Sequence, residues 1–160
     1  MKRSFPPVVA ADTRVLVLGS LPGEIALAKQ QYYGHPRNLF WPLMSRVIQA
    51  DLVPLGYDER LRTLLRAGVG LWDTVGTARR EGSLDAALRD VEANDLPALV
   101  ATLPALRAVG LNGGTSQKIG TRLLGGTDLV LVPLPSSSPA YASRSFEDKL
   151  ADWMRLRAYL

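Results

Sequence analysis

The feature that most constrains the fold is a short apolar run at residues 14–18, Arg-Val-Leu-Val-Leu, which leads directly into Gly-Ser-Leu-Pro-Gly at 19–23. Short apolar runs that contain β-branched residues are typical of buried strands in parallel sheets. In open α/β sheets, ligands bind beyond the carboxyl ends of the strands, where backbone N–H groups and helix N-termini converge. We therefore expect a strand over 14–19 and a ligand site that includes the turn after it.

Along the rest of the chain, short apolar runs typical of strands alternate with segments whose apolar residues recur at helical spacing. The pattern predicts further strands at 69–73, 107–111 and 128–132, and helices at 24–29, 39–50, 57–67, 83–88, 96–103, 115–124 and 145–159. Ser145 opens the last helix with a sequence close to a capping box. Because strands alternate with helices, the sequence predicts a three-layer α/β/α sandwich with a central four-stranded parallel sheet.

Length and composition narrow the class of protein. A chain of 160 residues suits one domain, 1–160, in which residues 1–13 form an N-terminal arm. The sequence has no apolar run of about 18 residues and no sustained apolar core of a signal peptide near its start, so we expect a cytoplasmic protein without a membrane span. With no cysteine and one histidine, the chain lacks thiolate nucleophiles and the usual ligands of zinc or iron–sulfur sites. We expect a monomer with no metal and no other cofactor.

The net charge of +4 suits a surface that binds DNA phosphates. Taken alone, this charge is equally compatible with an ordinary small basic protein. A more informative feature is a ten-residue segment that is dense in aromatic, amide and basic side chains, namely Tyr32, Tyr33, His35, Arg37, Asn38, Phe40 and Trp41. Packing of a core seldom requires such a concentration, so the segment predicts a site that holds a flat ligand.

Two separated segments carry a family resemblance. Residues 19–23 together with 31–41, Gln-Tyr-Tyr-Gly-His-Pro-Arg-Asn-Leu-Phe-Trp, resemble the first motif of the uracil-DNA glycosylase superfamily, and in particular of its family 6, the hypoxanthine-DNA (deoxyinosine) glycosylases. Residues 134–140, Leu-Pro-Ser-Ser-Ser-Pro-Ala, resemble the second motif. Segments 70–75, 82–85 and 112–115 also resemble the family, in the same order.

The resemblance implies a uracil-DNA glycosylase-like fold and an enzyme of base-excision repair. Such an enzyme binds DNA that contains deaminated bases and hydrolyses the N-glycosidic bond of a base flipped out of the duplex. For this chain the implied base is hypoxanthine, with uracil or xanthine as the alternative. Neither motif contains a lysine, and Lys29 is the nearest one, so we expect a monofunctional glycosylase without a lyase step.

Asn38 is the expected catalytic residue. Its amide can orient a water molecule through the carbonyl oxygen without any ionisation, and it matches an important Asn of the family 6 motif. From the residues alone, an N-cap of the following helix is the commoner role for an Asn at this place. One side chain can serve both purposes.

Several residues are expected to bind the base. Tyr33 matches an aromatic on which the flipped base stacks, although a core tyrosine is the alternative; Phe40 and Trp41 are assigned to packing. His35 can donate to a base or phosphate oxygen, or it can fix the loop before Pro36. Asn112 can bond the base edge, although a turn-forming Asn-Gly is the commoner explanation. The backbone wall of the pocket is expected at Gly19, Ser20, Leu21, Pro22 and Gly23.

The second motif is expected to bind DNA outside the pocket. Its loop would enter the minor groove and grip phosphates through Pro135, Ser136, Ser137, Ser138 and Pro139. Tyr141 is a candidate wedge that fills the place of the flipped base, or simply an exposed loop residue. Arg144 is a candidate phosphate contact, and Arg37 is either another one or only solvated.

The sequence departs from the superfamily pattern at two positions. Leu21 stands where many relatives have a catalytic Asp or Asn, and Leu134 stands where they often have a His or Asn that stabilises the departing base. These departures shift the expected catalytic role to Asn38 and argue against uracil as the main substrate. Two other functions remain open. One is a noncatalytic DNA- or nucleotide-binding module, and the other is a serine hydrolase that uses Ser136, Ser137 or Ser138 with His35, although no Gly-x-Ser-x-Gly elbow is present.

Overall fold

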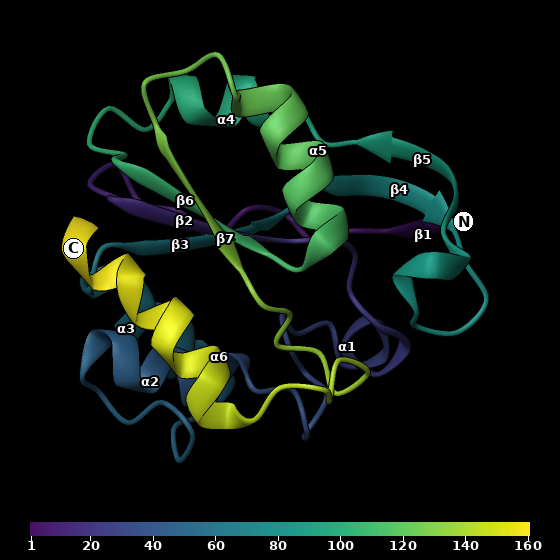
Figure 1. The fold of residues 1–160 in the computed structure, drawn as a ribbon, viewed down its shortest axis with the longest axis horizontal. Coiled ribbons are helices and arrows are strands. Elements are labelled where there is room, and N and C mark those ends of the chain that lie inside the picture. The colour runs from purple at the N-terminus through teal and green to yellow at the C-terminus, as the bar shows by residue number, and fades with distance from the viewer.

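A four-stranded parallel sheet forms the centre of the computed structural model, which describes residues 1–160 (Figure 1). Its strands are β2 (Val15–Gly19), β3 (Val69–Asp73), β6 (Ala108–Asn112) and β7 (Val130–Leu134), in the spatial order β3-β2-β6-β7. The register pairs Gly19 with Asp73 and Asn112 with Leu134, so four strand ends meet at one edge of the sheet. All four predicted strands are confirmed, although β7 begins two residues later than expected.

Helices cover both faces of this sheet (Figure 1). One face carries α2 (Phe40–Ile48), α3 (Tyr57–Arg66) and α6 (Phe146–Trp153), and the other carries α4 (Leu96–Ala101) and α5 (Gly114–Leu124). Alternate residues of β2 point into different layers: Val15 and Val17 join the cluster around Phe40, whereas Leu16 and Leu18 join the cluster around Leu124. This is the two-sided burial typical of a parallel strand, and the three-layer α/β/α sandwich is confirmed.

A second, antiparallel sheet was not predicted. It consists of β1 (Lys2–Arg3), β4 (Val75–Arg79) and β5 (Arg89–Ala93), in the order β1-β4-β5. Every residue of β5 is exposed, so the strand lacks the alternation of apolar and polar residues that predicts a half-buried strand. The helix predicted at 83–88 is only a 3₁₀ turn, Asp85–Ala87. Residues 1–13 lie along the sheets, because β1 pairs with β4 and Val8 bridges Leu71.

The remaining helices agree with the sequence in part. The short helix α1 (Glu24–Lys29) lies where it was expected. Ser145 caps α6 as predicted, since its hydroxyl accepts a hydrogen bond from the N–H of Asp148 at 3.2 Å. The single helix predicted over 145–159 is wrong, because α6 ends at Trp153 and a 3₁₀ helix follows over Met154–Tyr159. No helix is both long and apolar enough to cross a lipid bilayer.

Candidate active site

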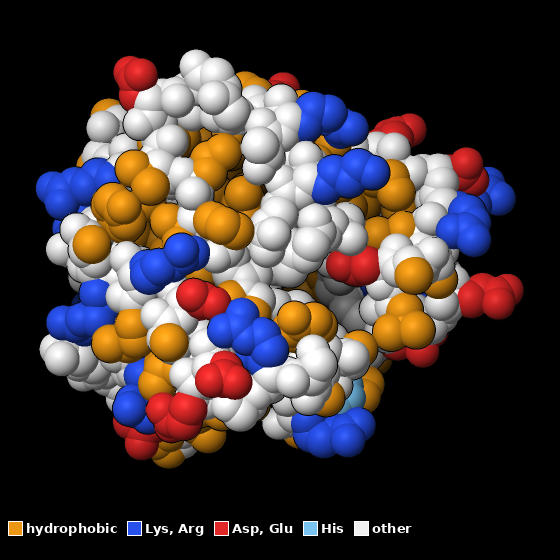
Figure 2. Space-filling view, viewed as in Figure 1, with side chains coloured by type: hydrophobic (Ala, Val, Ile, Leu, Met, Phe, Trp, Pro, Cys, Tyr) orange, Lys and Arg blue, Asp and Glu red, His pale blue; other side chains and the backbone are white.

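A cavity of about 310 Å³ lies at the carboxyl ends of β2, β3 and β6, and the terminal residues of these strands, Gly19, Asp73 and Asn112, are among its walls. The space-filling view shows a hollow on this face of the molecule (Figure 2). Most residues that the sequence assigned to the site line this cavity, namely Gly19, Ser20, Leu21, Pro22, Gly23, Tyr33, His35, Asn38, Asn112, Ser136, Ser137, Ser138, Pro139 and Tyr141. Arg37, Pro135 and Arg144 are not among the lining residues.

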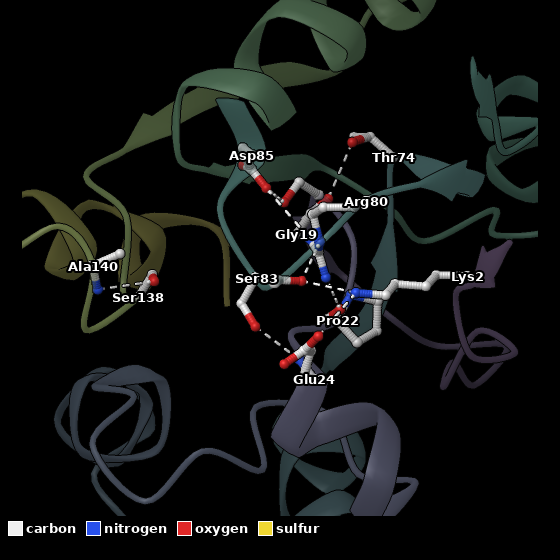
Figure 3. Close-up of polar contacts among 12 residues, drawn as sticks. Lys2, Gly19, Pro22, Glu24, Thr74, Arg80, Ser83, Asp85, Ser138 and Ala140 are labelled. Carbon is white, nitrogen blue, oxygen red and sulfur yellow. Dashed lines mark hydrogen bonds and ion pairs between the residues drawn. The ribbon is translucent and has the colours of Figure 1, made fainter. Parts of the chain in front are cut away.

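The glycine-rich turn at 19–23 is held by a loop that the sequence did not assign to the site. Arg80, whose side chain is fully buried, follows β4 and donates to the carbonyl oxygens of Pro22, at 2.5 Å, and Gly82, at 3.0 Å (Figure 3). Asp85 accepts a hydrogen bond from the hydroxyl of Ser20 at 2.8 Å. Burial lowers the pKa of Arg80, and the charge of Asp85 opposes that shift. The loop therefore fixes one wall of the cavity from behind.

Asp73 is a wall residue that was also missed. Only 4 % of the residue is exposed, and its Oδ2 is buried without a hydrogen-bond partner. A Cβ atom on the neighbouring Gly19 would lie 2.6 Å from Asp73 Oδ1 and 3.0 Å from Tyr33 Oη, so only glycine leaves room for both groups. Burial raises the pKa of Asp73 well above its usual value, and the nearby charge of Asp85 adds to the shift.

Tyr33 holds an unusual position at the cavity. Its backbone has a φ of +52°, in the left-handed region that tyrosine rarely adopts. Its ring stacks on Phe40 with the centroids 3.9 Å apart and the planes 9° apart, and its hydroxyl accepts a long hydrogen bond from Asn112 Nδ2 at 3.4 Å. Burial, followed by the charge of Asp73, raises the pKa of Tyr33. The phenol therefore stays neutral and its ring is held from one face.

Asn38 and His35 each use one side-chain atom for the local backbone. Asn38 Oδ1 accepts a hydrogen bond from the N–H of Phe40, the first residue of α2, at 2.9 Å. The N-cap of α2 is Leu39 rather than Asn38, so Asn38 supports the start of the helix from the position before the N-cap. A carbonyl oxygen has two lone pairs, and one therefore remains for another donor. His35 Nδ1 accepts from the N–H of Arg37 at 3.0 Å. In the neutral ring the proton is then on Nε2, which can donate.

Hydrogen bonds join the second-motif loop both to β6 and to the first motif. The side chain of Asn112 donates to Ser137 Oγ at 2.9 Å and accepts from the N–H of Ser137 at 3.0 Å. The carbonyl oxygen of Ser137 in turn accepts from the N–H of Leu39, just before α2, at 3.0 Å. Residues almost a hundred positions apart thus form one rigid wall, and Asn112 holds the second-motif loop as well as lining the cavity.

The outer part of the second-motif loop is anchored to α6. Lys149 is buried, donates to the carbonyl oxygen of Tyr141 at 2.6 Å, and lies 5.1 Å from the centre of the Tyr141 ring. Burial lowers the pKa of Lys149, and the charge of Arg144 lowers it further. Arg144 itself is paired with Asp152 at 2.9 Å. Tyr141 remains 41 % exposed at the rim of the cavity.

The ionisable groups of the lining are mostly acidic. Glu24, Asp73 and Asp85 line the cavity, His35 is the one potentially basic side chain, and no Lys or Arg is present. Figure 2 shows Lys and Arg scattered among acidic residues over this face rather than gathered in a stripe. No cluster of three or more His, Cys, Asp or Glu side chains is arranged to hold a metal ion. His35 makes no hydrogen bond to a serine hydroxyl, so the arrangement of a serine hydrolase is not formed.

Comparisons with known proteins agree with this fold. The family model of the Uracil DNA glycosylase superfamily matches residues 6–159, and the chain belongs to this superfamily. The sequence is 38% identical over 154 residues to a protein of Methanosarcina barkeri named Hypoxanthine DNA glycosylase, with 95% of each chain covered. It is 39% identical over 154 residues to a protein of the same name from Methanosarcina acetivorans, with 96% of each chain covered.

The fold is also similar to a solved structure. The solution NMR structure of a uracil DNA glycosylase candidate from Methanosarcina acetivorans matches with a TM-score of 0.88 and 37% identity, over 99% of this chain and 98% of that one. The superfamily and the fold inferred from the two motifs are therefore confirmed. The individual roles of the site residues stay predictions.

Proposed function

We propose that this protein is a monofunctional DNA glycosylase of base-excision repair that removes hypoxanthine from deoxyinosine sites. The observation that carries the proposal is the cavity in which both motifs meet, in a chain that belongs to the Uracil DNA glycosylase superfamily. The two Methanosarcina relatives named Hypoxanthine DNA glycosylase support the choice of base. Their likeness extends over nearly the whole chain, so it includes every segment that lines the cavity.

The chemistry required of such a site fits the residues that line it. The target nucleotide leaves the stack and its base enters the cavity, since the sugar carbon is inaccessible inside a duplex. The base leaves with the electron pair of the glycosidic bond while water attacks the cation-like sugar carbon. In our proposal Asn38 positions that water through the free lone pair of Oδ1.

The remaining roles concern binding of the base and of the DNA. Tyr33, which is fixed by Phe40 on one side, offers its ring for stacking, an interaction worth about 1–3 kcal/mol per base. His35 Nε2 and the backbone of residues 19–23 are candidate hydrogen-bonding groups for the base edge. Tyr141 is the candidate wedge because it is exposed at the rim. We propose that Arg37 and Arg144, outside the cavity, contact phosphates. On binding DNA, Arg144 would leave its ion pair with Asp152 and pair with a phosphate instead.

Two alternatives differ in measurable ways. An enzyme that excises uracil or xanthine would use the same site and would differ only in which base edge the site recognises. A noncatalytic DNA-binding module would retain the basic surface without needing Asn38. A monomeric state and a cytoplasmic location remain further predictions, of which the first is tested by light scattering.

The deciding experiment is excision from labelled oligonucleotides that carry one deoxyinosine, uracil or xanthine, as duplex and as single strand. The native protein is expected to give alkali-labile sites at deoxyinosine, without strand breakage before alkali. Asn38→Ala is expected to lose excision and retain DNA binding. Gln49→Ala, which removes an exposed amide at the far end of α2, is the matched control and should excise like the native protein. Native protein that binds all these duplexes but cleaves none would favour the noncatalytic module.

A further inference from the structure

We propose that Asp73, as a neutral carboxylic acid, touches the flipped base and donates a hydrogen bond to it as the base departs. This inference rests on the proposed glycosylase function and adds to it a catalytic residue from a third strand. Asp73 lies outside both sequence motifs, at the carboxyl end of β3. The argument depends on its position, its unused bonding capacity and its surroundings.

Position is the first step. Asp73 lines the cavity and lies beside Gly19 across the parallel register of β2 and β3. The backbone at this point is fixed, since the carbonyl oxygen of Asp73 accepts a hydrogen bond from Asn94 Nδ2 at 2.8 Å. The absence of a side chain at Gly19 leaves space for the carboxyl group, because a Cβ there would lie 2.6 Å from Oδ1. The fold thus holds this group at the cavity wall within a defined space.

Unused bonding capacity is the second step. The side chain of Asp73 makes no hydrogen bond within the protein, and Oδ2 is buried with no partner. Leaving a buried polar atom unpaired costs about 1–3 kcal/mol, so such atoms are rare unless a ligand or a functional role accounts for them. Oδ1 also makes no hydrogen bond and is not fully enclosed, so it is the atom of Asp73 that a base in the cavity can reach. Leu134, which is fully buried and apolar, offers no competing donor from the second motif.

The surroundings decide the protonation state. The titratable groups that face Asp73 are the phenols of Tyr32 and Tyr33 and the carboxylate of Asp85, and no Lys or Arg lines the cavity. None of these groups compensates a negative charge on Asp73. Burial and the charge of Asp85 therefore raise its pKa and favour the neutral acid, which is a hydrogen-bond donor. A carboxylic acid kept neutral by an apolar site is an established way to stabilise a developing anion.

The reaction step balances without a proton being lost from Asp73. The bond between the sugar carbon C1′ and the base nitrogen N9 breaks, and its electron pair goes to the base. The water oxygen bonds to C1′, and the proton released by that water ends on the base through solvent, giving the free base and an abasic sugar. Asp73 donates a hydrogen bond to an acceptor atom of the base while negative charge develops there, and it keeps its proton. An ionised Asp73 would instead repel the departing base.

The test is the single-turnover excision rate on a deoxyinosine duplex, measured from mildly acidic to mildly alkaline pH. The native rate is expected to decline as pH rises through the raised pKa of Asp73, a readout that needs no variant. Asp73→Ala is expected to lower the rate by about 10²–10³-fold, the usual effect of removing one such donor. Asp73→Asn keeps an N–H donor, so it should lose less activity and lose the alkaline decline. Asp128→Asn, an exposed acid before β7, is the matched control.

The outcomes are distinct. Asp73 variants that cut as fast as the native protein would overturn the inference and leave the glycosylase function intact. A native rate that rises with pH, together with an inactive Asp73→Asn, would overturn it in favour of an ionised Asp73 acting as a base. Native protein that cuts no base would overturn both this inference and the proposed function. Thermal melts of each variant establish that any loss of rate belongs to folded protein.

Discussion

Replacing Arg80 with methionine tests whether the loop behind the glycine-rich turn supports the site. The side chain of Arg80 is fully buried and donates to the carbonyl oxygens of Pro22 and Gly82. Hydrogen bonds from a charged donor contribute about 1.5–3 kcal/mol each, so two of them contribute about 3–6 kcal/mol. Removing a buried charge recovers part of this, because the guanidinium no longer has to be desolvated. We expect a net loss of about 2–4 kcal/mol in the free energy of unfolding.

The expected loss is large enough to measure. For a domain of this size, 1 kcal/mol shifts the melting temperature by about 2–4 °C, so Arg80→Met should melt about 4–16 °C lower than the native protein. Circular dichroism melts measure the melting temperature, and urea unfolding measures the free energy of unfolding independently. Below its melting temperature the variant should still excise more slowly, because the wall at Pro22 is no longer fixed. Arg80→Lys keeps the charge but lacks the two separate guanidinium nitrogens that bond the two carbonyl oxygens, so it should melt between Arg80→Met and the native protein.

The neighbouring arginine is the matched control. The side chain of Arg79 is 69% exposed and forms only a 3.6 Å ion pair with the exposed Asp90, so Arg79→Met should change stability by no more than about 0.5 kcal/mol. If Arg80→Met melts and excises like Arg79→Met, then the buried guanidinium does not hold the turn, and the reasoning from its hydrogen bonds is refuted.

Two further predictions concern the wall on the other side of the cavity. In the unfolded chain Asp73 loses its proton above about its ordinary pKa of 3.8, whereas in the folded protein the raised pKa keeps the proton bound. The stability of the native protein should therefore fall as pH rises from about 3.8 through the raised pKa. Asp73→Asn should therefore be more stable than the native protein in urea at mildly alkaline pH and no more stable below pH 3.8; equal stability at both would contradict the shift. Gly19→Ala should lose about 1–3 kcal/mol by overpacking against Asp73 and Tyr33, and should also lower the excision rate. Gly126→Ala, where a Cβ meets nothing within 4 Å, should change neither quantity in the same melts and assays.

The central sheet could be predicted because its strands carry a strong local signal. β2 is buried at every residue and ends in glycine, and an apolar strand that ends in a turn predicts a ligand site at that edge. Twelve of the site residues named from the two motifs line the cavity for this reason. Asp73 was within reach of the same argument: it is the last residue of a strand predicted over 69–73, and strand ends of a parallel sheet meet at one edge. Segment 70–75, which contains Asp73, also resembles the family, but it lies outside the two motifs from which site residues were predicted.

The second sheet could not be predicted, because its stability depends on long-range pairing. β1 has two residues, and β5 is exposed throughout, so neither has a local pattern of its own. They exist because β4 continues almost directly from β3 and provides an edge on each side. This sheet places Arg80, Ser83 and Asp85 against the glycine-rich turn and the start of α1. In sequence they read as an ordinary polar loop, and their role became visible only from the contacts with residues 20–24.

The two leucines that replace polar residues of the superfamily pattern restrict where the polar groups of the cavity can lie. Leu21 is buried against Val75, Ala78 and Ile119, and Leu134 is buried in the main core. A polar side chain at either position would have to displace this packing or be desolvated without a partner, which is costly. The polar groups of the cavity must therefore come from positions that the core does not fill. Asn38, just before α2, and Asp73, at the end of β3, are such positions. The side chain of Asn38 accepts from the N–H of Phe40, the carbonyl oxygen of Asp73 accepts from the side chain of Asn94, and each residue keeps bonding capacity for a ligand.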